Sequence, residues 1–505
     1  MTGGGVPRRP LTATELIETV LDRGSWRTWD TAVTALPEDP GYRADLVRAR
    51  ERTGLDEAVR TGEGHIHGRR VAVIACEFGF LAGSIGVDAG DRLVTAVERA
   101  TRDRLPLVAA PASGGTRMQE GTVAFLQMVK VAAAINDHKA AGLPYLVYLR
   151  HPTTGGVLAS WGSLGHMTAA EPGALIGFLG PRVYEALYGE PFPEGVQVAE
   201  NLYARGLVDA VVAPDQLAEI AARVLDVMCA QRDPSAYAEI PTVDAPPEEL
   251  PDVPAAESIR RTRRPDRPGV RELLKVAAGD ITPLSGTAAG ERDPGLLLAL
   301  ARFGTAPCVL LGQDRRARSR PLGPAGLREA RRGMHLAAEL GLPLVSVIDT
   351  AGAALSTEAE EGGLAGEIAR CLAELATLSA PTVCLLLGEG AGGGALALLP
   401  ADRVIAAQHA WLSPLPPEGA SAILYRTTDR MAEIADRQGV RSADLLASGI
   451  IDRIVPERPD AADEPDAFLR RVGAVLEAET AALLRADPRE RVTARRRRYR
   501  DLGHR

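Results

Sequence analysis

The sequence predicts an α/β protein made of two similar domains in tandem, each repeating a unit of roughly 200 residues. One observation behind this is a proline that stands nine residues before a glycine turn in each half: Pro106 and Gly115, then Pro343 and Gly352. Another is that an apolar run leads into each turn and a helical pattern follows it, the order of a strand, a turn and a helix. The chain is therefore expected to alternate strands with helices, as α/β domains do.

Further landmarks follow in the same order in both halves. A second strand with a second glycine cluster comes next, at 145–157 and at 382–395. Each half then closes on a related phrase, ARGLVDAVV at 204–212 and ASGIIDRIV at 447–455. This shared order favours an internal duplication over two unrelated α/β domains that both use glycine turns.

Individual elements follow from the spacing of apolar residues and from glycine and proline signals. Helices are expected at 11–22, 43–60, 88–102, 217–229 and 465–502, and strands in a hairpin at 62–75 and in the segment 174–183. The helix after the first glycine turn is expected to bury one face, whose members recur at steps of three and four: Phe125, Met128, Ala132 and Ile135.

These patterns divide the chain into five segments. They are an N-terminal helical segment at 1–60, a first domain at 61–231, a linker at 232–268, a second domain at 269–463 and a helical tail at 464–505. The linker is inferred because its prolines and acidic residues cannot form a packed core.

The composition is that of a soluble globular protein, with 46% hydrophobic and 25% charged residues. A formal net charge of -8 argues against nucleic acid as a partner, and the arginines at 495–498 are interpreted as the solvated face of a terminal helix. The five cysteines contain no Cys-x-x-Cys pair, which fits a reducing compartment. The first residues contain no signal-peptide core, and charges interrupt every long apolar stretch. We therefore expect a cytoplasmic protein that does not enter a membrane.

Several familiar catalytic sites are excluded. No phosphate-binding Gly-Lys loop and no Gly-x-Ser-x-Gly nucleophile elbow occurs. Gly388, Gly390 and Gly393 match a dinucleotide fingerprint, but no acidic residue follows about 20 positions later. His65 and His67 lie two apart on a predicted strand without a carboxylate or cysteine at ligand spacing, so we interpret them as exposed strand residues rather than metal ligands.

What remains is four glycine turns, two in each half, without an obvious nucleophile or acid–base pair. Residues without a Cβ let a ligand approach the backbone, and the start of a helix leaves amide N–H groups without partners. Such a site suits a reaction that passes through an oxyanion, where one donor is worth roughly 3–4 kcal/mol. Two halves could hold two oxyanions at once. The alternative is that the glycines only allow tight packing.

The glycine turns and their surroundings resemble a known family. The runs ASGGTRMQEG at 112–121, PTTGGV at 152–157 and AEPGALIGFLGPRV at 170–183 closely resemble the β subunit of the bacterial acetyl-CoA carboxylase carboxyltransferase. The runs DTAGA at 349–353, GEGAGGGA at 388–395 and SPLPPEG at 413–419 resemble the α subunit of the same enzyme. The resemblance covers about residues 40–215 and 260–502, and the chain looks like the two subunits fused, β first.

This resemblance implies two tandem crotonase-like (ClpP/crotonase) ββα-superhelix domains. It implies transfer of a carboxyl group from carboxybiotin on a separate carrier protein to a CoA thioester, acetyl-CoA or a short acyl-CoA, which gives malonyl-CoA for fatty acid biosynthesis. The expected partners are a biotin carboxylase and the biotin carboxyl carrier protein, and the chain is expected to form a homodimer or a larger homo-oligomer. The biotin nitrogen is expected to take the α proton, so that no side-chain base is needed.

The resemblance also implies the residues of the site. In the first domain the thioester enolate oxygen is expected to be held by the backbone amides of Gly114, Gly115, Thr116, Gly155 and Gly156. In the second domain the ureido oxygen of biotin is expected to be held by those of Gly352, Ala353, Gly393, Gly394 and Ala395.

The chain departs from the family pattern at several points. The family's β subunit normally carries a zinc ribbon of four cysteines, whereas no cysteine precedes Cys76 here, so we expect no zinc. Family members usually have alanine where Thr116 stands, proline where Ala351 stands, and Gly-Ser at 391–392. Two alternatives stay open: a biotin-independent acyl-CoA decarboxylase or hydrolase of the crotonase superfamily, and a non-catalytic assembly subunit.

Overall fold

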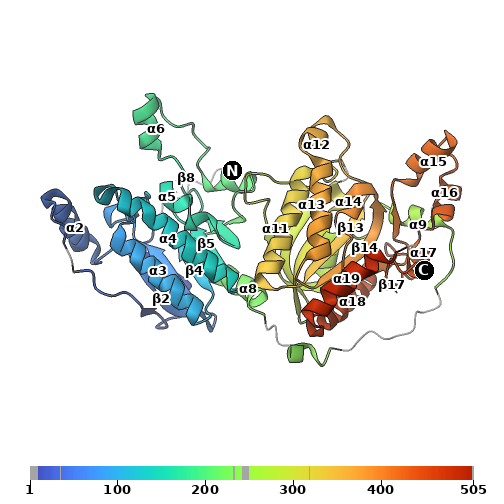
Figure 1. Cartoon of the computed structure of the whole chain (residues 1–505), viewed down its shortest axis with the longest axis horizontal. Helices are drawn as coiled ribbons and strands as arrows, with labels where there is room; N and C mark the ends of the chain where they lie inside the picture. The colour runs from blue at the N-terminus through green and yellow to red at the C-terminus, as the bar shows by residue number, and fades with distance from the viewer. Residues whose placement is uncertain (1–8, 35, 231–233, 241–249, 318, 503–505) are drawn as a thin grey trace. The chain divides into compact units, whose positions relative to one another are not determined.

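Two compact units make up the chain, Met1–Cys229 and Ala230–Arg505, and each is an α/β unit built around one sheet (Figure 1). The computed structural model describes residues 9–34, 36–230, 234–240, 250–317 and 319–502. The predicted α/β class is confirmed. None of the helices in this described part of the chain is both long and apolar enough to cross a membrane.

The first unit contains a seven-stranded sheet with the order β1-β2-β3-β4-β5-β7-β9. Its strands are β1 (Arg27–Thr28), β2 (Val59–Ile66), β3 (Arg69–Cys76), β4 (Leu107–Ala110), β5 (Tyr145–Leu149), β7 (Met167–Ala170) and β9 (Ala210–Val211). The strands β2 and β3 form the predicted antiparallel hairpin, and from β3 to β9 neighbouring strands run parallel. Two short strands, β6 (Thr153–Thr154) and β8 (Ile176–Gly177), pair with each other apart from this sheet.

The second unit repeats this strand order. Its main path is β10-β11-β12-β13-β14-β15-β17, and β16 pairs with β14. The strands are β10 (Ala278–Leu284), β11 (Leu296–Phe303), β12 (Ala306–Gln313), β13 (Leu344–Thr350), β14 (Thr382–Ala391), β15 (Arg403–Ala407), β16 (Trp411–Ser413) and β17 (Arg453–Val455). An antiparallel start again changes to parallel pairing at the third strand, β12. The duplicated sheet supports the interpretation of the chain as an internal repeat.

Helices cover the sheets in corresponding ways. In the first unit α3 (Val87–Arg102) and α4 (Gly121–Ala140) lie side by side, and in the second α11 (Pro324–Leu340) and α13 (Leu364–Thr377) do so (Figure 1). The other helices of the first unit are α1 (Ala13–Val20), α2 (Pro40–Thr53), α5 (Gly155–Leu158), α6 (Pro181–Tyr188), α7 (Ala199–Ala204) and α8 (Leu217–Met228). Those of the second are α9 (Ala255–Thr262), α10 (Val270–Ala277), α12 (Thr357–Glu361), α14 (Gly392–Leu396), α15 (Pro417–Tyr425), α16 (Met431–Gln438), α17 (Ser442–Ala447), α18 (Pro465–Arg485) and α19 (Pro488–Arg500).

The buried face of α4 differs from the predicted one. Met128 and Ile135 are buried as expected, but Ala132 is only half-buried and Phe125 is 59% exposed. The helix turns Ala124, Gln127 and Val131 inward instead. Apolar residues occupy both faces of α4, so their spacing alone could not select the buried one.

The predicted linker at 232–268 ends sooner in the structure. Residues 231–233 and 241–249 lie outside the described part, but from Ala255 the chain forms α9 and belongs to the second unit. Ala255 and Ile259 are fully buried, and the buried Arg267 guanidinium lies 2.7 Å from the Glu457 carboxylate. Of the eight prolines that suggested a linker, six precede α9, whereas Pro265 and Pro268 follow it within the second unit.

The arginine run at 495–498 is only partly a solvated face. Arg496 and Arg497 are exposed, whereas Arg495 is 1% exposed and pairs with Asp402 at 2.7 Å. The Arg495 guanidinium also donates to backbone carbonyls, including that of Leu375 at 2.7 Å. The planar fork of arginine can satisfy a carboxylate and several carbonyls together, which anchors α19 to the second unit.

Candidate active site

The two glycine turns of the first unit touch each other through their backbones. One follows β4, and the other is the start of α5. A Cβ placed on Gly115 would lie 3.2 Å from the nitrogen of Gly156, and one on Gly155 would lie 3.3 Å from the carbonyl oxygen of Gly114. Gly115 and Gly155 also have positive φ angles of 106° and 61°. The structure thus brings these predicted site residues together, and glycine is what allows the close approach.

Several predicted donors of the first unit already have partners inside the protein. The amide of Gly114 donates to Ala82 at 2.8 Å, and that of Gly155 donates to Phe178 at 3.0 Å. The Gly115 amide donates to the Ser113 hydroxyl at 3.0 Å.

The amides of Thr116 and Gly156 are engaged by no described residue. Gly156 is in the first turn of α5, where N–H groups lack intrahelical partners. These two residues are therefore the donors that stay available to a ligand.

Buried polar contacts hold the first turn in place. The Ser113 hydroxyl donates to the carbonyl of Gly83 at 2.6 Å. The buried Arg117 guanidinium donates to Glu57 at 2.7 Å and to the carbonyl of Ser84 at 2.7 Å. Burial opposes a charge on Arg117, but the Glu57 carboxylate outweighs it and raises the pKa of the guanidinium. The turn is thus anchored on both sides of the glycines.

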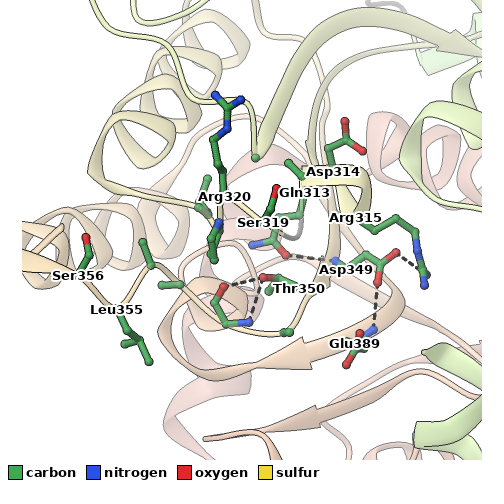
Figure 2. A pocket seen from close by; sticks show the side chains of 18 of the residues that line it. Gln313, Asp314, Arg315, Ser319, Arg320, Asp349, Thr350, Leu355, Ser356 and Glu389 are labelled. Atoms are coloured by element: carbon green, nitrogen blue, oxygen red, sulfur yellow. Dashed lines mark hydrogen bonds and ion pairs between the residues drawn. The ribbon is translucent and has the colours of Figure 1, made fainter. Parts of the chain in front are cut away.

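The second unit repeats the arrangement between β13 and α14. A Cβ on Gly394 would lie 3.1 Å from the nitrogen of Ala353 and 3.3 Å from the carbonyl carbon of Gly352. Gly352 has a positive φ angle of 139°. Its amide donates to the Thr350 hydroxyl at 3.1 Å, as the Gly115 amide does to Ser113, and Figure 2 shows this bond.

The available donors of the second unit follow the same pattern. The Ala353 amide is engaged by no described residue. Gly393 and Gly394 lie in the first turn of α14, where amides lack intrahelical partners. Ala395 was also predicted as a donor, but it is fully buried, and as the fourth residue of α14 its amide bonds the carbonyl of Ala391 within the helix.

A pocket of about 770 Å³ adjoins this second pair of turns. Gly352, Ala353 and the exposed side chain of Leu355 line one part of it. Charged groups line another part, among them Arg315 and Glu389 (Figure 2).

The buried charges of the pocket wall are paired. The Arg315 guanidinium lies 3.0 Å from the Asp349 carboxylate, whose other oxygen accepts the Glu389 amide at 3.2 Å. Burial raises the pKa of Asp349, against the lowering effect of Arg315. Arg263 pairs with Glu389 at 3.0 Å and also with Glu418. The wall therefore offers a fixed polar surface rather than an isolated acid or base.

Three histidines of the first unit bond to backbone groups. The ring of His138 lies 3.3 Å from the carbonyl oxygen of Pro144, and burial lowers its pKa to about 4. His166 accepts the amide of Tyr145 at 3.0 Å, and His151 accepts that of Leu175 at 3.0 Å. These contacts are structural.

The residue-level prediction missed the hydroxyl residues before the glycines. The sequence does carry a signal for them, because Ser113 and Thr350 each stand two positions before the matching glycine. A hydroxyl at that spacing often bonds a nearby backbone amide in a turn.

Comparison with known proteins places this site in a family. The carboxyl transferase domain matches residues 6–494. The Mycobacterium bovis protein named probable biotin-dependent acyl-coenzyme A carboxylase beta3 subunit is 61% identical over 495 residues, which are 98% of this chain and 99% of that protein. The Parafrankia protein named acetyl-coenzyme A carboxylase carboxyl transferase subunits beta/alpha is 38% identical, over 98% of this chain and 86% of its own length.

Solved structures show the same fold. The transcarboxylase 12S crystal structure with methylmalonyl-coenzyme A bound has a TM-score of 0.71 at 21% identity and covers 91% of this chain and 89% of its own. A single-chain, multi-domain long-chain acyl-CoA carboxylase has a TM-score of 0.68 at 19% identity, over 91% of this chain and 45% of its own. These matches confirm the expected crotonase-like carboxyltransferase fold.

The class of protein defined by this fold and these relatives is a carboxyltransferase. The chain belongs to the carboxyl transferase domain family, which confirms the resemblance found in the sequence. The names of the relatives agree with the expected biotin-dependent chemistry on CoA thioesters. Among the described residues, no group of three or more histidine, cysteine or acidic side chains could hold a metal ion. The expectation that zinc is absent stays a prediction for metal analysis.

Proposed function

We propose that the chain is the carboxyltransferase component of a biotin-dependent acyl-CoA carboxylase. It transfers a carboxyl group from carboxybiotin to acetyl-CoA or another short acyl-CoA, and acetyl-CoA gives malonyl-CoA. The observation that carries this proposal is the repeated pair of touching glycine turns, each of which leaves backbone amides available. The partners that we propose are a biotin carboxylase and a biotin carrier protein.

In the first unit the available amides suit the thioester. The amides of Thr116 and Gly156 would hold the thioester oxygen as negative charge develops on it in the enolate. Each such donor is typically worth roughly 3–4 kcal/mol in the transition state. The contacts of Ser113 and Arg117 keep the turn rigid, so that little reorganisation is needed when the charge forms.

In the second unit the available amides suit a neutral urea oxygen. Ala353, with Gly393 and Gly394 of α14, would hold the ureido oxygen of biotin, and the adjoining pocket has room for a ring system. When bound, biotin supplies the carboxyl group, and its ureido nitrogen accepts the α proton of the acyl-CoA. The protein's own part is to hold and orient the two oxygens, since three histidines of the first unit bond backbone groups and the buried charges of the pocket are paired.

The reverse half-reaction tests the proposal. Malonyl-CoA should be decarboxylated slowly, and addition of a free biotin derivative should accelerate this. An equal rate without biotin would favour the biotin-independent decarboxylase or hydrolase. A protein that binds neither acyl-CoA nor a biotinylated carrier would be an assembly subunit. Comparing kcat/KM for acetyl-CoA and propionyl-CoA in the complete system would then identify the preferred acyl chain.

A further inference from the structure

One buried side chain of the second unit bonds both segments that carry its glycine turns. Gln313 ends β12 and is 2% exposed. Its amide nitrogen donates to the carbonyl oxygen of Gly394 at 2.6 Å, and its oxygen accepts the amide of Asp349 at 3.2 Å. Figure 2 shows Gln313 beside Asp349, at the start of the turn that contains Gly352. Gln313 thus ties α14 and the turn after β13 to a third strand.

The bond to Gly394 anchors the start of α14. Ala395 is the fourth residue of this helix, so its N–H bonds the carbonyl of Ala391 within the helix and is not open to a ligand. The carbonyl of Gly394 points the opposite way, because the two groups belong to one planar peptide. Gln313 therefore holds the first turn of α14, in which the amides of Gly393 and Gly394 have no intrahelical partner.

The bond to Asp349 holds the turn after β13 at a fixed distance from the start of α14. A Cβ on Gly394 would lie only 3.1 Å from the nitrogen of Ala353, so the two turns touch without spare room. Gln313 reaches both from one rigid strand. The carboxylate of Asp349 is held separately by Arg315 at 3.0 Å, so Gln313 contacts only the backbone of Asp349.

The first unit has a different residue at the equivalent position. The β3–β4 register pairs Ala72 with Leu107, and the β12–β13 register pairs Val309 with Leu344. Leu107 and Leu344 each follow the proline that marks the repeat, so four residues further on Cys76 corresponds to Gln313. A buried cysteine cannot span two segments with a donor and an acceptor. The bridge is therefore specific to the second site.

We propose that Gln313 is a positioning residue for carboxyl transfer, which holds the first turn of α14 and sets its spacing from Ala353. This inference rests on the proposed function of the second unit as the site for the biotin ureido oxygen. Gln313 acts through these backbone groups and does not itself touch a substrate.

The test uses Gln313→Glu in biotin-dependent decarboxylation of malonyl-CoA by the full-length protein. At pH 8 a carboxylate would face the carbonyl of Gly394, and we expect kcat to fall by about 10- to 100-fold, less than the roughly 10²- to 10³-fold cost of losing a donor altogether. The KM for malonyl-CoA should stay within about twofold, because this substrate is placed in the first unit. At lower pH the protonated carboxyl regains a donor, so the ratio of variant to wild-type rate should recover.

Two other variants complete the experiment. Gln313→Met keeps a similar volume without polar atoms, and its rate should stay low at every pH. It also carries the test if Gln313→Glu does not fold. Gln408→Glu is the matched control, because Gln408 is a buried glutamine of the same unit that accepts the Glu457 amide at 2.9 Å. This variant should change the melting temperature, but the ratio of its rate to the wild-type rate should not vary with pH.

Three results would overturn the inference. They are an unchanged kcat in folded Gln313→Glu and Gln313→Met, a loss that does not recover at low pH in Gln313→Glu, and a KM for malonyl-CoA that rises as much as kcat falls. Biotin-independent turnover by the wild type would instead overturn the proposed function, and this inference with it.

Discussion

The hydroxyls of Ser113 and Thr350 each accept a hydrogen bond from the amide of the glycine two residues further along the chain. Because that glycine amide is engaged, the amide available to a ligand is that of the next residue, Thr116 in the first unit and Ala353 in the second. They also hold the glycines in their positive-φ conformations, at 106° for Gly115 and 139° for Gly352. A short hydroxyl side chain thus decides which amide of the turn can meet a ligand.

Gly394→Ala should remove a donor of the second unit without unfolding it. The φ angle of Gly394 is not positive, but the new methyl group would lie 3.1 Å from the nitrogen of Ala353 and would cover that amide. We expect transfer to slow by roughly 10²- to 10³-fold, the effect of one lost donor. Steady-state kinetics beside circular dichroism would measure this. Gly419→Ala is the control, because its methyl group would meet only the Leu415 side chain at 3.9 Å and should leave the rate unchanged.

Alanine at His138, His151 or His166 should have much smaller effects on the chemical step. All three rings bond backbone groups, and a side-chain base would contribute roughly 10²- to 10⁴-fold. Loss of stability is expected instead, so single-turnover rates must be measured on folded protein. If one of these variants lost as much rate as Gly394→Ala while remaining folded, the proton-accepting role proposed for biotin would be wrong.

The pairing of the glycine turns could be predicted from the sequence, whereas the choice of donor within each turn could not. Gly115 and Gly352 stand at the same offset from a proline, which revealed the repeat. Whether an amide is already bonded depends on contacts over long distances, such as that of Gly155 with Phe178. Gln313 was missed because a single glutamine at the end of an apolar strand carries no spacing signal.

At the scale of elements, Glu329 makes the helix α11 sensitive to pH. Burial raises its pKa to about 7, and one of its carboxylate oxygens has no hydrogen-bond partner in the described structure. An ordinary glutamate has a pKa of about 4.3, so between these values the folded protein holds a proton that the unfolded chain has released. Stability should therefore fall as pH rises through this window.

Glu329→Gln should remove this dependence. The variant should match the wild type near pH 5 and exceed it at pH 8 by about 1–3 kcal/mol, as measured by chemical denaturation. Glu219→Gln, at an exposed position of α8, is the control and should show no such divergence. A constant difference between Glu329→Gln and wild type at both pH values would contradict the assignment.

Elements with one dominant period were predicted well. The hairpin of β2 and β3 and the helix α3 lie close to their expected bounds. Strict alternation fits only a strand, and a strong amphipathic pattern with a period of 3.6 residues fits only a helix. The face of α4 was wrong because both of its sides are apolar. Arg495 was misjudged because a buried arginine and a solvated one look alike until a partner such as Asp402 is known.

At the scale of the whole molecule, both units expose large apolar side chains. On α4 these are Val123, Phe125, Leu126 and Val129, and in the second unit they are Leu355, Ile423 and Leu424, with Leu355 95% exposed. Several exposed apolar side chains on one helix, as on α4, mark an interaction site in a soluble protein. A symmetric assembly of identical chains would cover it on every copy.

We therefore predict a homodimer or a larger homo-oligomer. Sedimentation at micromolar concentration should give at least twice the mass of one chain, and Phe125→Glu should weaken association. Arg470→Glu, at another exposed position, on α18, should not. A monomeric protein with full activity would contradict the prediction.

The hydroxyls of Ser113 and Thr350 make the same bond to a glycine amide in the two units, so each turn can serve as a reference for the other. Both copies of the turn share one polypeptide, one solvent and one temperature, so any change of medium acts on them together. Ser113→Ala and Thr350→Ala free equivalent amides, but Ser113→Ala also removes the donor to the Gly83 carbonyl. Once the free energy of unfolding of each variant has been measured, the remaining difference between their rates reports what each turn binds. The two turns can therefore be compared within one protein. In separate subunits the same comparison would require their concentrations and preparation to be matched first.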